Sequence, residues 1–291
     1  MRIDPAFVGR EVHGPARVVT WRETTSYAAA TGDANPRYLD DSVAGGLVAP
    51  PMFAVALTWP MLAGIGRAIE GFPIEVMKTM VHSGEHLRFF RLVRPGDRIE
   101  LHGRIVALRP GRAGTRLVLR VSAEAGGEPV FTEYATALLR GVECPDGGAS
   151  IEDLPEPMVV NETNVPSWES MIPLAREAPF VYDACTGIVF PIHTSVSYAR
   201  QAGLPDLLIQ GTCTLAMAAR EIIDREAGGD PSALREIGCS FRGMVIPPTT
   251  IGVRLTARAP GDGETNLAFK VVDAAGNPAL DMGRAIVGAA R

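Results

Sequence analysis

Two short segments of the sequence carry side chains that could transfer protons. "TGIVFPIHTS" (186–195) contains His193, and "TGDANPRYLD" (31–40) contains Asp33. Histidine and carboxylate side chains serve as general acids and bases, and each contributes roughly 10²–10⁴-fold to a reaction rate. In the first segment an aliphatic residue, Ile188, stands where an acid would be expected. The residue types therefore predict proton-transfer chemistry, with the histidine in one loop and the carboxylate in the other.

These two loops belong to a longer internal repeat. In the first block of the repeat Tyr27 is matched by Tyr182, and Tyr38 is matched by His193. Few residues are identical, but three blocks recur in the same order with nearly constant spacing: 27–41 with 182–196, 47–57 with 207–217, and 88–101 with 240–253. The repeat predicts two halves built on one structural plan.

The hydrophobic pattern of each half predicts a loop, then one long helix, then a meander of strands. We expect the helices at about 51–69 and 211–226. Runs rich in Val, Leu and Ile, separated by Gly-containing turns, predict strands at 98–107, 114–125, 129–140, 234–242, 250–259, 265–273 and 278–288. A long apolar helix that a sheet must cover is typical of an α+β arrangement.

The junction between the halves is rich in Pro, Gly and acidic residues, a composition that suits a crossing linker. We therefore predict an N-terminal half at 1–145, a linker at 146–170 and a C-terminal half at 171–291. The C-terminal half, which carries His193, is the candidate for the active site.

The composition favours a folded protein over a disordered one, with 46% hydrophobic and 21% charged residues in 291. The net charge of −5 argues against a nucleic-acid partner, which a basic surface would serve. Prolines and a glycine interrupt the longest apolar stretch (47–65), so we expect a buried helix and no membrane span. No signal peptide is visible at the start. The four cysteines are widely spaced, which predicts reduced thiols, a cytoplasmic location and no metal site.

The loop sequences resemble a known family. "GDANP", followed by Asp40, Asp41 and "APPMF", is similar to the N-terminal half of the MaoC-like hydratase/dehydratase family. "TG..FPIHTS..YA...GLPDLLIQGTCTLA" resembles its C-terminal half. The resemblance implies a tandem (double) hotdog, in which each half wraps an antiparallel sheet around a long helix. It also implies (R)-specific hydration of an enoyl thioester, or dehydration of a 3-hydroxyacyl thioester, carried by CoA or a carrier protein. No cofactor is needed for that reaction, and further association into a homodimer is plausible.

The resemblance assigns roles residue by residue in the C-terminal half. His193 matches the histidine of the family's motif, and Gly211 stands where its oxyanion-hole glycine would be. Ile188 occupies the position of the motif aspartate, so this loop departs from the pattern. We predict His193 and Gly211 as the catalytic residues. The predicted substrate-binding residues are Thr194, Ser195, Gln210, Asp33 and Asn35.

The N-terminal half departs from the pattern in the opposite way. Asp33 and Asn35 match the motif, but Tyr38 replaces the histidine. Pro50 and Pro51 align with Gln210 and Gly211, and proline has no N–H to donate. We therefore expect no catalysis of the family's kind in this half, whose role would be to accommodate the acyl chain or to complete the fold.

Structural roles remain open for the same residues. His193 could bond a backbone carbonyl, Asp33 could close an Asp/Asn-Pro turn, and Gly211 could serve helix geometry alone. His82 and His86 have a spacing that suits a metal only on a helix, which the sequence does not favour there. Besides a hydratase, two other functions remain open: a non-catalytic acyl-thioester-binding or partner protein, and a hotdog thioesterase that uses Asp33.

Overall fold

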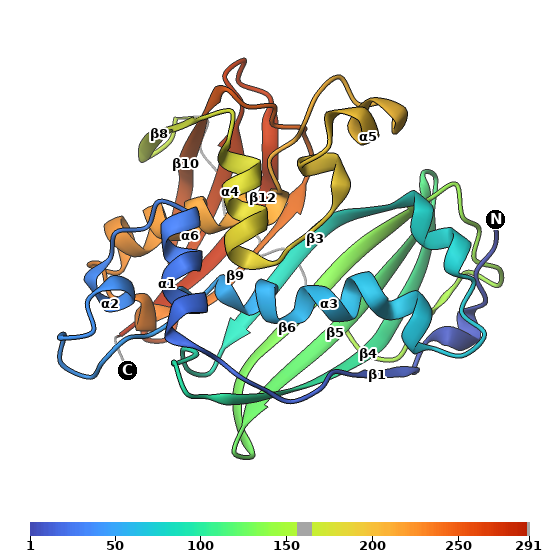
Figure 1. The fold of residues 1–291 in the computed structure, drawn as a ribbon, viewed down its shortest axis with the longest axis horizontal. Helices are drawn as coiled ribbons and strands as arrows, with labels where there is room; N and C mark the ends of the chain where they lie inside the picture. Colours follow the sequence, from blue (N-terminus) through green and yellow to red (C-terminus); the bar gives the residue numbers. More distant parts are fainter. Residues whose placement is uncertain (156–164, 290–291) are drawn as a thin grey trace.

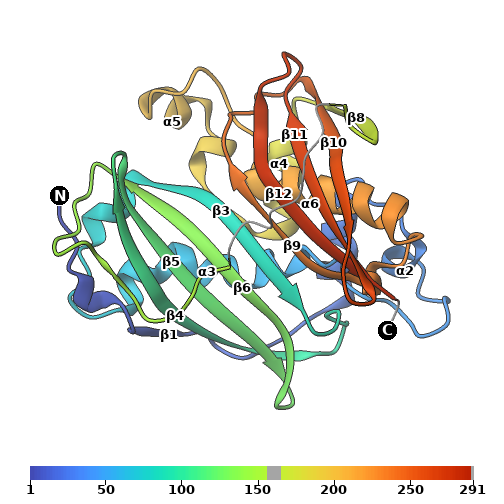
Figure 2. The ribbon, with the colours of Figure 1, turned by 180° about the vertical axis from the view of Figure 1, so that it is seen from behind.

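The computed structural model describes residues 1–155 and 165–289, which contain a single antiparallel sheet of twelve strands. The strands are β1 (Glu11–His13), β2 (Arg17–Val18), β3 (Met80–Phe89), β4 (Arg98–Gly111), β5 (Gly114–Ala125), β6 (Glu128–Arg140), β7 (Ala149–Ser150), β8 (Trp168–Leu174), β9 (Leu234–Phe241), β10 (Thr249–Pro260), β11 (Glu264–Val272) and β12 (Pro278–Gly288). The order in space is β1-β4-β5-β6-β3-β9-β12-β11-β10-β8, with β2 and β7 also paired to β4. The N-terminal half therefore joins the C-terminal half edge to edge, where β3 pairs with β9 (Figure 2).

Helices lie on one side of this sheet (Figure 1). The α-helices are α1 (Trp21–Ala30), α2 (Pro36–Leu39), α3 (Phe53–Ala68), α4 (Ala178–Thr186), α5 (Val196–Gln201) and α6 (Gly211–Glu226). Short 3-10 turns are η1 (Pro5–Phe7), η2 (Ile74–Thr79), η3 (Pro191–His193) and η4 (Pro231–Ala233). The long helices α3 and α6 each have 16 residues, one for each half. Helices α1 and α4 lie side by side between the two halves.

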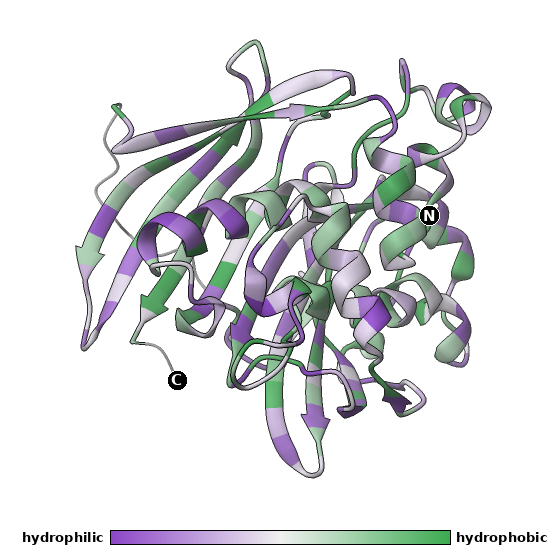
Figure 3. Ribbon diagram, turned by 60° about the vertical axis from the view of Figure 1, so that its left-hand side comes forward, coloured by the Kyte–Doolittle hydropathy of each residue, from purple (hydrophilic) through white to green (hydrophobic). Residues whose placement is uncertain are grey.

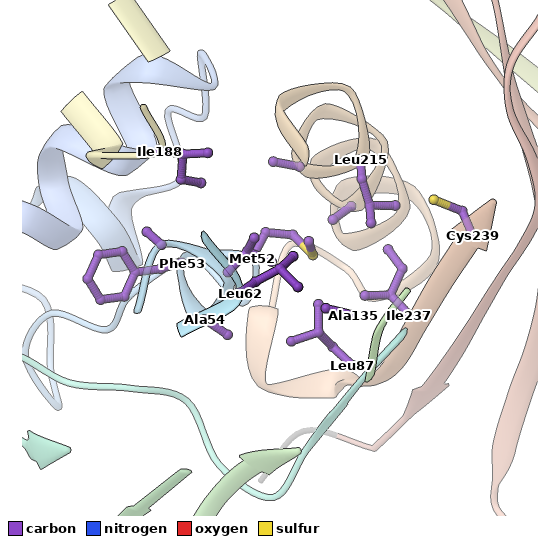
Figure 4. Close-up of a cluster of buried hydrophobic side chains, with 14 of the residues drawn as sticks. Met52, Phe53, Ala54, Leu62, Leu87, Ala135, Ile188, Leu215, Ile237 and Cys239 are labelled. Atoms are coloured by element: carbon purple, nitrogen blue, oxygen red, sulfur yellow. The ribbon is translucent and has the colours of Figure 1, made fainter. Parts of the chain in front are cut away.

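Alternating side chains explain how the sheet covers the helices. Along β4 the burial alternates over its first six residues, as expected for a strand with one face on the core. Figure 3 shows the corresponding alternation of hydrophobic and hydrophilic residues along several strands. The buried faces of both halves form one continuous hydrophobic core. Figure 4 shows part of it, with Met52 from the first half beside Leu215 and Ile237 from the second.

The structure confirms the predicted α+β plan, one long helix and a strand meander in each half. Helix α6 has the predicted bounds, and α3 begins two residues later than predicted, at Phe53. Strand β8 begins at Trp168, inside the segment that we predicted as a linker. The repeat is visible in space, because Tyr27 of α1 and Tyr182 of α4 contact each other through their hydroxyl groups. Within the described ranges we find no helix with the length and apolar character needed to span a bilayer.

Candidate active site

A cavity of about 230 Å³ lies at the start of α6, where the two halves meet. Its walls are mostly apolar. Val81, which is 41% exposed, and Met244, which is 54% exposed, lie on its rim and place its mouth at the surface. The polar side chains on the walls are His82, His193, Gln210, Thr212, Thr214 and Arg242. A concave apolar site with a few convergent polar groups is the usual form of a small-molecule site.

His193 has the environment of a general base. It ends the 3-10 turn η3, and its Nδ1 lies 2.8 Å from the backbone oxygen of Leu208. A carbonyl can only accept a hydrogen bond, so Nδ1 carries the proton and Nε2 keeps its lone pair. Burial lowers the pKa of His193, although the bond to Leu208 opposes this shift. The ring is therefore neutral at pH 7, and Nε2 can take a proton from water.

The start of α6 offers hydrogen-bond donors to the same cavity. The first intrahelical donor is the Cys213 N–H, which reaches the Gln210 oxygen at 3.0 Å, so the N–H groups of Gly211 and Thr212 precede the helical ladder. The positive end of the helix dipole lies at this point and favours negative charge. The Gln210 Nε2 donates to the Pro179 oxygen at 3.2 Å. Its buried Oε1 has no hydrogen-bond partner in the described parts of the chain.

Gly211 is required by the close approach of an aromatic ring. A Cβ atom at position 211 would lie 2.7 Å from Cδ1 of Phe241, nearer than side-chain atoms approach. We expect Gly211→Ala to lower the free energy of unfolding by about 1–3 kcal/mol, because it overpacks this contact. Thermal denaturation will measure this, and Gly211→Ala combined with Phe241→Leu should recover most of the loss. Equal melting temperatures for wild type and Gly211→Ala would contradict the assignment.

Of the predicted residues around His193, some line the cavity and others do not. Ile188 is 3% exposed and lines the cavity, so the position of the motif aspartate does face the candidate site. Thr194 and Ser195 do not line it. The Ser195 hydroxyl accepts a hydrogen bond from the Tyr198 N–H and caps α5. The cavity hydroxyls are instead those of Thr212 and Thr214, which the sequence analysis overlooked. Their signal was available, because they follow Gly211 at the start of a predicted helix.

Asp33 and Asn35 lie away from this cavity. The Asp33 carboxylate accepts the Asn35 N–H at 3.1 Å, and burial raises the pKa of Asp33 to about 6. The Asn35 side chain caps α2 and donates to the Gly229 oxygen at 2.7 Å, just past the end of α6. Arg220 lies nearby and bonds the Gly32 oxygen at 3.0 Å. These contacts give Asp33 and Asn35 a role in closing a turn. The turn packs against the C-terminal end of α6, whereas Gly211 lies at its N-terminal end.

The first turn of α3 supports the predicted loss of a donor in the N-terminal half. The Phe53 N–H bonds the Pro50 oxygen at 2.9 Å, as the Cys213 N–H bonds the Gln210 oxygen in α6. Pro51 therefore takes the place of Gly211, and it has no N–H to offer.

A second group of titratable side chains lies inside the N-terminal half. His82 Nε2 is 3.1 Å from Oε2 of Glu85, and the Glu85 carboxyl interacts with that of Glu133. Glu85 and Glu133 are 3% and 2% exposed. Burial raises the pKa of Glu85 to about 8 and lowers that of His82 to about 4. Two buried carboxyl groups without a cation beside them are stable only when protonated.

Glu85 should make the stability of the protein depend on pH. Its pKa is about 8 in the folded chain and about 4.3 in an unfolded one, so folding takes up a proton between these values. The contribution of Glu85 to the free energy of unfolding should therefore fall as pH rises from about 5 to 8, and Glu85→Gln should remove this contribution. Melting temperatures across this pH range will measure it, with the exposed Glu75→Gln as control. Parallel curves for wild type and Glu85→Gln would show that Glu85 is not protonated in the fold.

Comparisons with known sequences place both halves in dehydratase families. Residues 162–274 match the model of the MaoC like domain, and residues 6–133 match that of the FAS1-like dehydratase domain region. A 3-hydroxyacyl-thioester dehydratase of Mycobacterium tuberculosis is 26% identical over 88% of this chain and 85% of its own. A Dictyostelium discoideum protein described as a probable enoyl-CoA hydratase 2 is 22% identical over 64% of this chain, which spans only 63% of its length.

Solved structures show the same fold. A MaoC-like dehydratase from Phytophthora capsici superposes with a TM-score of 0.85 at 18% identity, covering 97% of this chain and 96% of its own. A Mycobacterium tuberculosis protein described as having a double hotdog fold gives a TM-score of 0.61 at 16% identity, covering 96% of each chain. This chain therefore carries a FAS1-like dehydratase domain region in its N-terminal half and a MaoC like domain in its C-terminal half, arranged as a tandem double hotdog.

Proposed function

We propose that this chain hydrates enoyl thioesters, and in reverse dehydrates 3-hydroxyacyl thioesters, in the cavity at the start of α6. The observation that carries the proposal is that His193 and Gly211 line one apolar cavity. His193 Nε2 has no bond among the described residues and can act as a base, and the Gly211 N–H can act as a donor. The reactions named for its relatives support the same assignment.

In the proposed reaction His193 moves the proton. Water sits between Nε2 of His193 and the unpartnered Oε1 of Gln210, gives its proton to Nε2, and its oxygen bonds to C3 of the enoyl group. The electrons of the double bond move onto the thioester oxygen, which the Gly211 N–H and the α6 dipole stabilise. His193 then returns the proton to C2, so that one water is added in all. A single base can thereby work although Ile188 supplies no acid.

The cavity suits the substrate that this reaction requires. Its apolar walls accept an acyl chain, and the exposed Arg242 at its edge provides a cation for the phosphates of CoA or of a carrier's prosthetic group. We place the reaction in the cytoplasm, which the four free cysteines support. Association of two chains into a homodimer is part of the proposal, and size-exclusion chromatography with light scattering will test it.

The proposed function is tested with purified protein and enoyl-CoA substrates of short, long, branched and dicarboxylic chains. Loss of the enoyl thioester absorbance without release of free thiol is the expected result. Release of CoA would instead indicate a thioesterase. Binding of these thioesters without any turnover would overturn the proposal in favour of a non-catalytic binding protein. The presence of Ile188 at the position of the motif aspartate favours that second function.

A further inference from the structure

A chain of three buried hydroxyl groups runs from the contact between the two halves to the wall of the cavity. The hydroxyl of Tyr27 in α1 lies 3.2 Å from that of Tyr182 in α4, and the Tyr182 hydroxyl lies 3.1 Å from Oγ1 of Thr212 in α6. Both tyrosines are 0% exposed, and Thr212 is 3% exposed. Thr212 directly follows Gly211 and lines the cavity beside His193.

The direction of these bonds leaves one proton unassigned. Tyr182 donates to Thr212, so the Thr212 hydroxyl still has its own proton to give. A threonine in a helix usually donates to the carbonyl four residues earlier, as Thr214 does to the Gln210 oxygen at 3.5 Å. For Thr212 that carbonyl belongs to Leu208, which lies before the extended N-cap residue Gln210 and therefore outside the helix.

The cavity is the remaining direction for this proton. Buried hydroxyl groups almost always find an acceptor, and across the described ranges the Thr212 hydroxyl has no recorded bond besides the one from Tyr182. Beside it, the Oε1 of Gln210 is also without a partner there, although Gln210 is only 2% exposed. An unused donor and an unused acceptor on adjoining walls of one cavity indicate that a polar ligand completes both.

We propose that the Thr212 hydroxyl is a second donor to the thioester oxygen, beside the Gly211 N–H. The inference rests on the proposed hydration and names a catalytic residue for it. Negative charge develops on this oxygen when water adds to C3, so a fixed donor stabilises the transition state more than the substrate. Each hydroxyl that donates along a chain polarises the next one, which strengthens the donor at its end.

The tyrosines are positioning residues in this account. Tyr182 takes no direct part in the chemistry, but its hydroxyl fixes the position of Oγ1 of Thr212. Tyr27, from the other half of the molecule, fixes the position of the Tyr182 hydroxyl. The N-terminal half, whose own helix start carries Pro51, thus contributes to the site of the C-terminal half through Tyr27.

Thr212→Val is the decisive variant, because valine keeps the branched shape and removes the hydroxyl. We expect kcat for hydration to fall by roughly 10²–10³-fold, the usual effect of losing one oxyanion donor, with little change in KM. Thr212→Ser should retain most of the activity. Tyr182→Phe and Tyr27→Phe should lower kcat by smaller factors in that order. The control is Thr24→Val, which alters a buried helical threonine that bonds the Trp21 oxygen at 2.9 Å in α1.

The vibrational frequency of the bound thioester carbonyl separates a catalytic role from a structural one. In a His193→Ala background, where the enoyl-CoA is consumed only slowly, the carbonyl band should shift to lower frequency on binding, and Thr212→Val should remove part of the shift. A wild type that hydrates enoyl-CoA while Thr212→Val matches it in kcat and carbonyl frequency would overturn this inference alone. A wild type that hydrates no thioester would overturn the proposed function instead. If Thr212→Val fails to fold, Tyr182→Phe and the Ser variant decide by the same two readouts.

Discussion

His193→Ala should lower kcat for enoyl thioester hydration by roughly 10²–10⁴-fold, because it removes the group that takes the proton from water and returns it to C2. The fold should persist, since the ring's recorded side-chain bond is the one to the Leu208 oxygen. In wild type, kcat/KM should fall at acid pH as Nε2 becomes protonated. Burial lowers the pKa of His193, so the midpoint of that fall should lie below the ordinary histidine value of about 6.5.

Steady-state rates and a pH profile from pH 5 to 9 will measure both effects. The matched control is His102→Ala, which removes an exposed histidine on β4, away from the cavity. Full activity in His193→Ala, with the fold intact by circular dichroism, would show that another group performs the proton transfer.

Ile188→Asp should raise kcat for hydration by about 10–100-fold, because it places a carboxyl group on the wall of the cavity that His193 and Gly211 also line. With a second proton-transfer group, His193 would no longer have to both accept and donate the proton in one turnover. Such a pair accelerates the reaction more than either group alone. The change also has a cost. Ile188 belongs to the continuous core (Figure 4), so a carboxyl group there should lower the free energy of unfolding by about 2–5 kcal/mol.

Ile188→Asn separates the acid from the polarity, since it has nearly the same size and does not titrate. We expect Ile188→Asn to show the loss of stability without the gain in rate. Flat activity in folded Ile188→Asp would mean that the chemistry of this cavity does not follow the family's acid–base pair.

Much of the fold could be predicted because its signals are local. Helix α6 has the predicted bounds, and the three predicted strands of the first half correspond to β4, β5 and β6. Strands β3 and β8 were harder. Strand β3 contains a bulge between His82 and Gly84 that breaks the alternation on which strand prediction depends, and β8 lies in a segment whose composition resembles a linker.

The candidate site could be predicted only in part. Its loop residue His193 and its helix start at Gly211 follow from motif positions, and both line the cavity. The place of Thr212 at the helix start could be predicted, but its proposed role as a donor could not, because that role depends on Tyr182 and Tyr27 meeting across the two halves. The buried pair of Glu85 and Glu133 was missed for the same reason. Their interaction depends on the pairing of β3 with β6, which the sequence does not show, although the alternation along β6 places Glu133 on the same buried face as Phe131 and Ala135.

A crystal structure of His193→Ala with a bound enoyl-CoA tests the central claim most directly. The proposed reaction predicts the thioester oxygen at about 2.7–3.2 Å from the Gly211 nitrogen, with C3 of the acyl group facing position 193 and the chain running along the apolar walls. A thioester bound elsewhere, with no acceptor at the Gly211 N–H, would contradict the assignment of this cavity as the site of hydration.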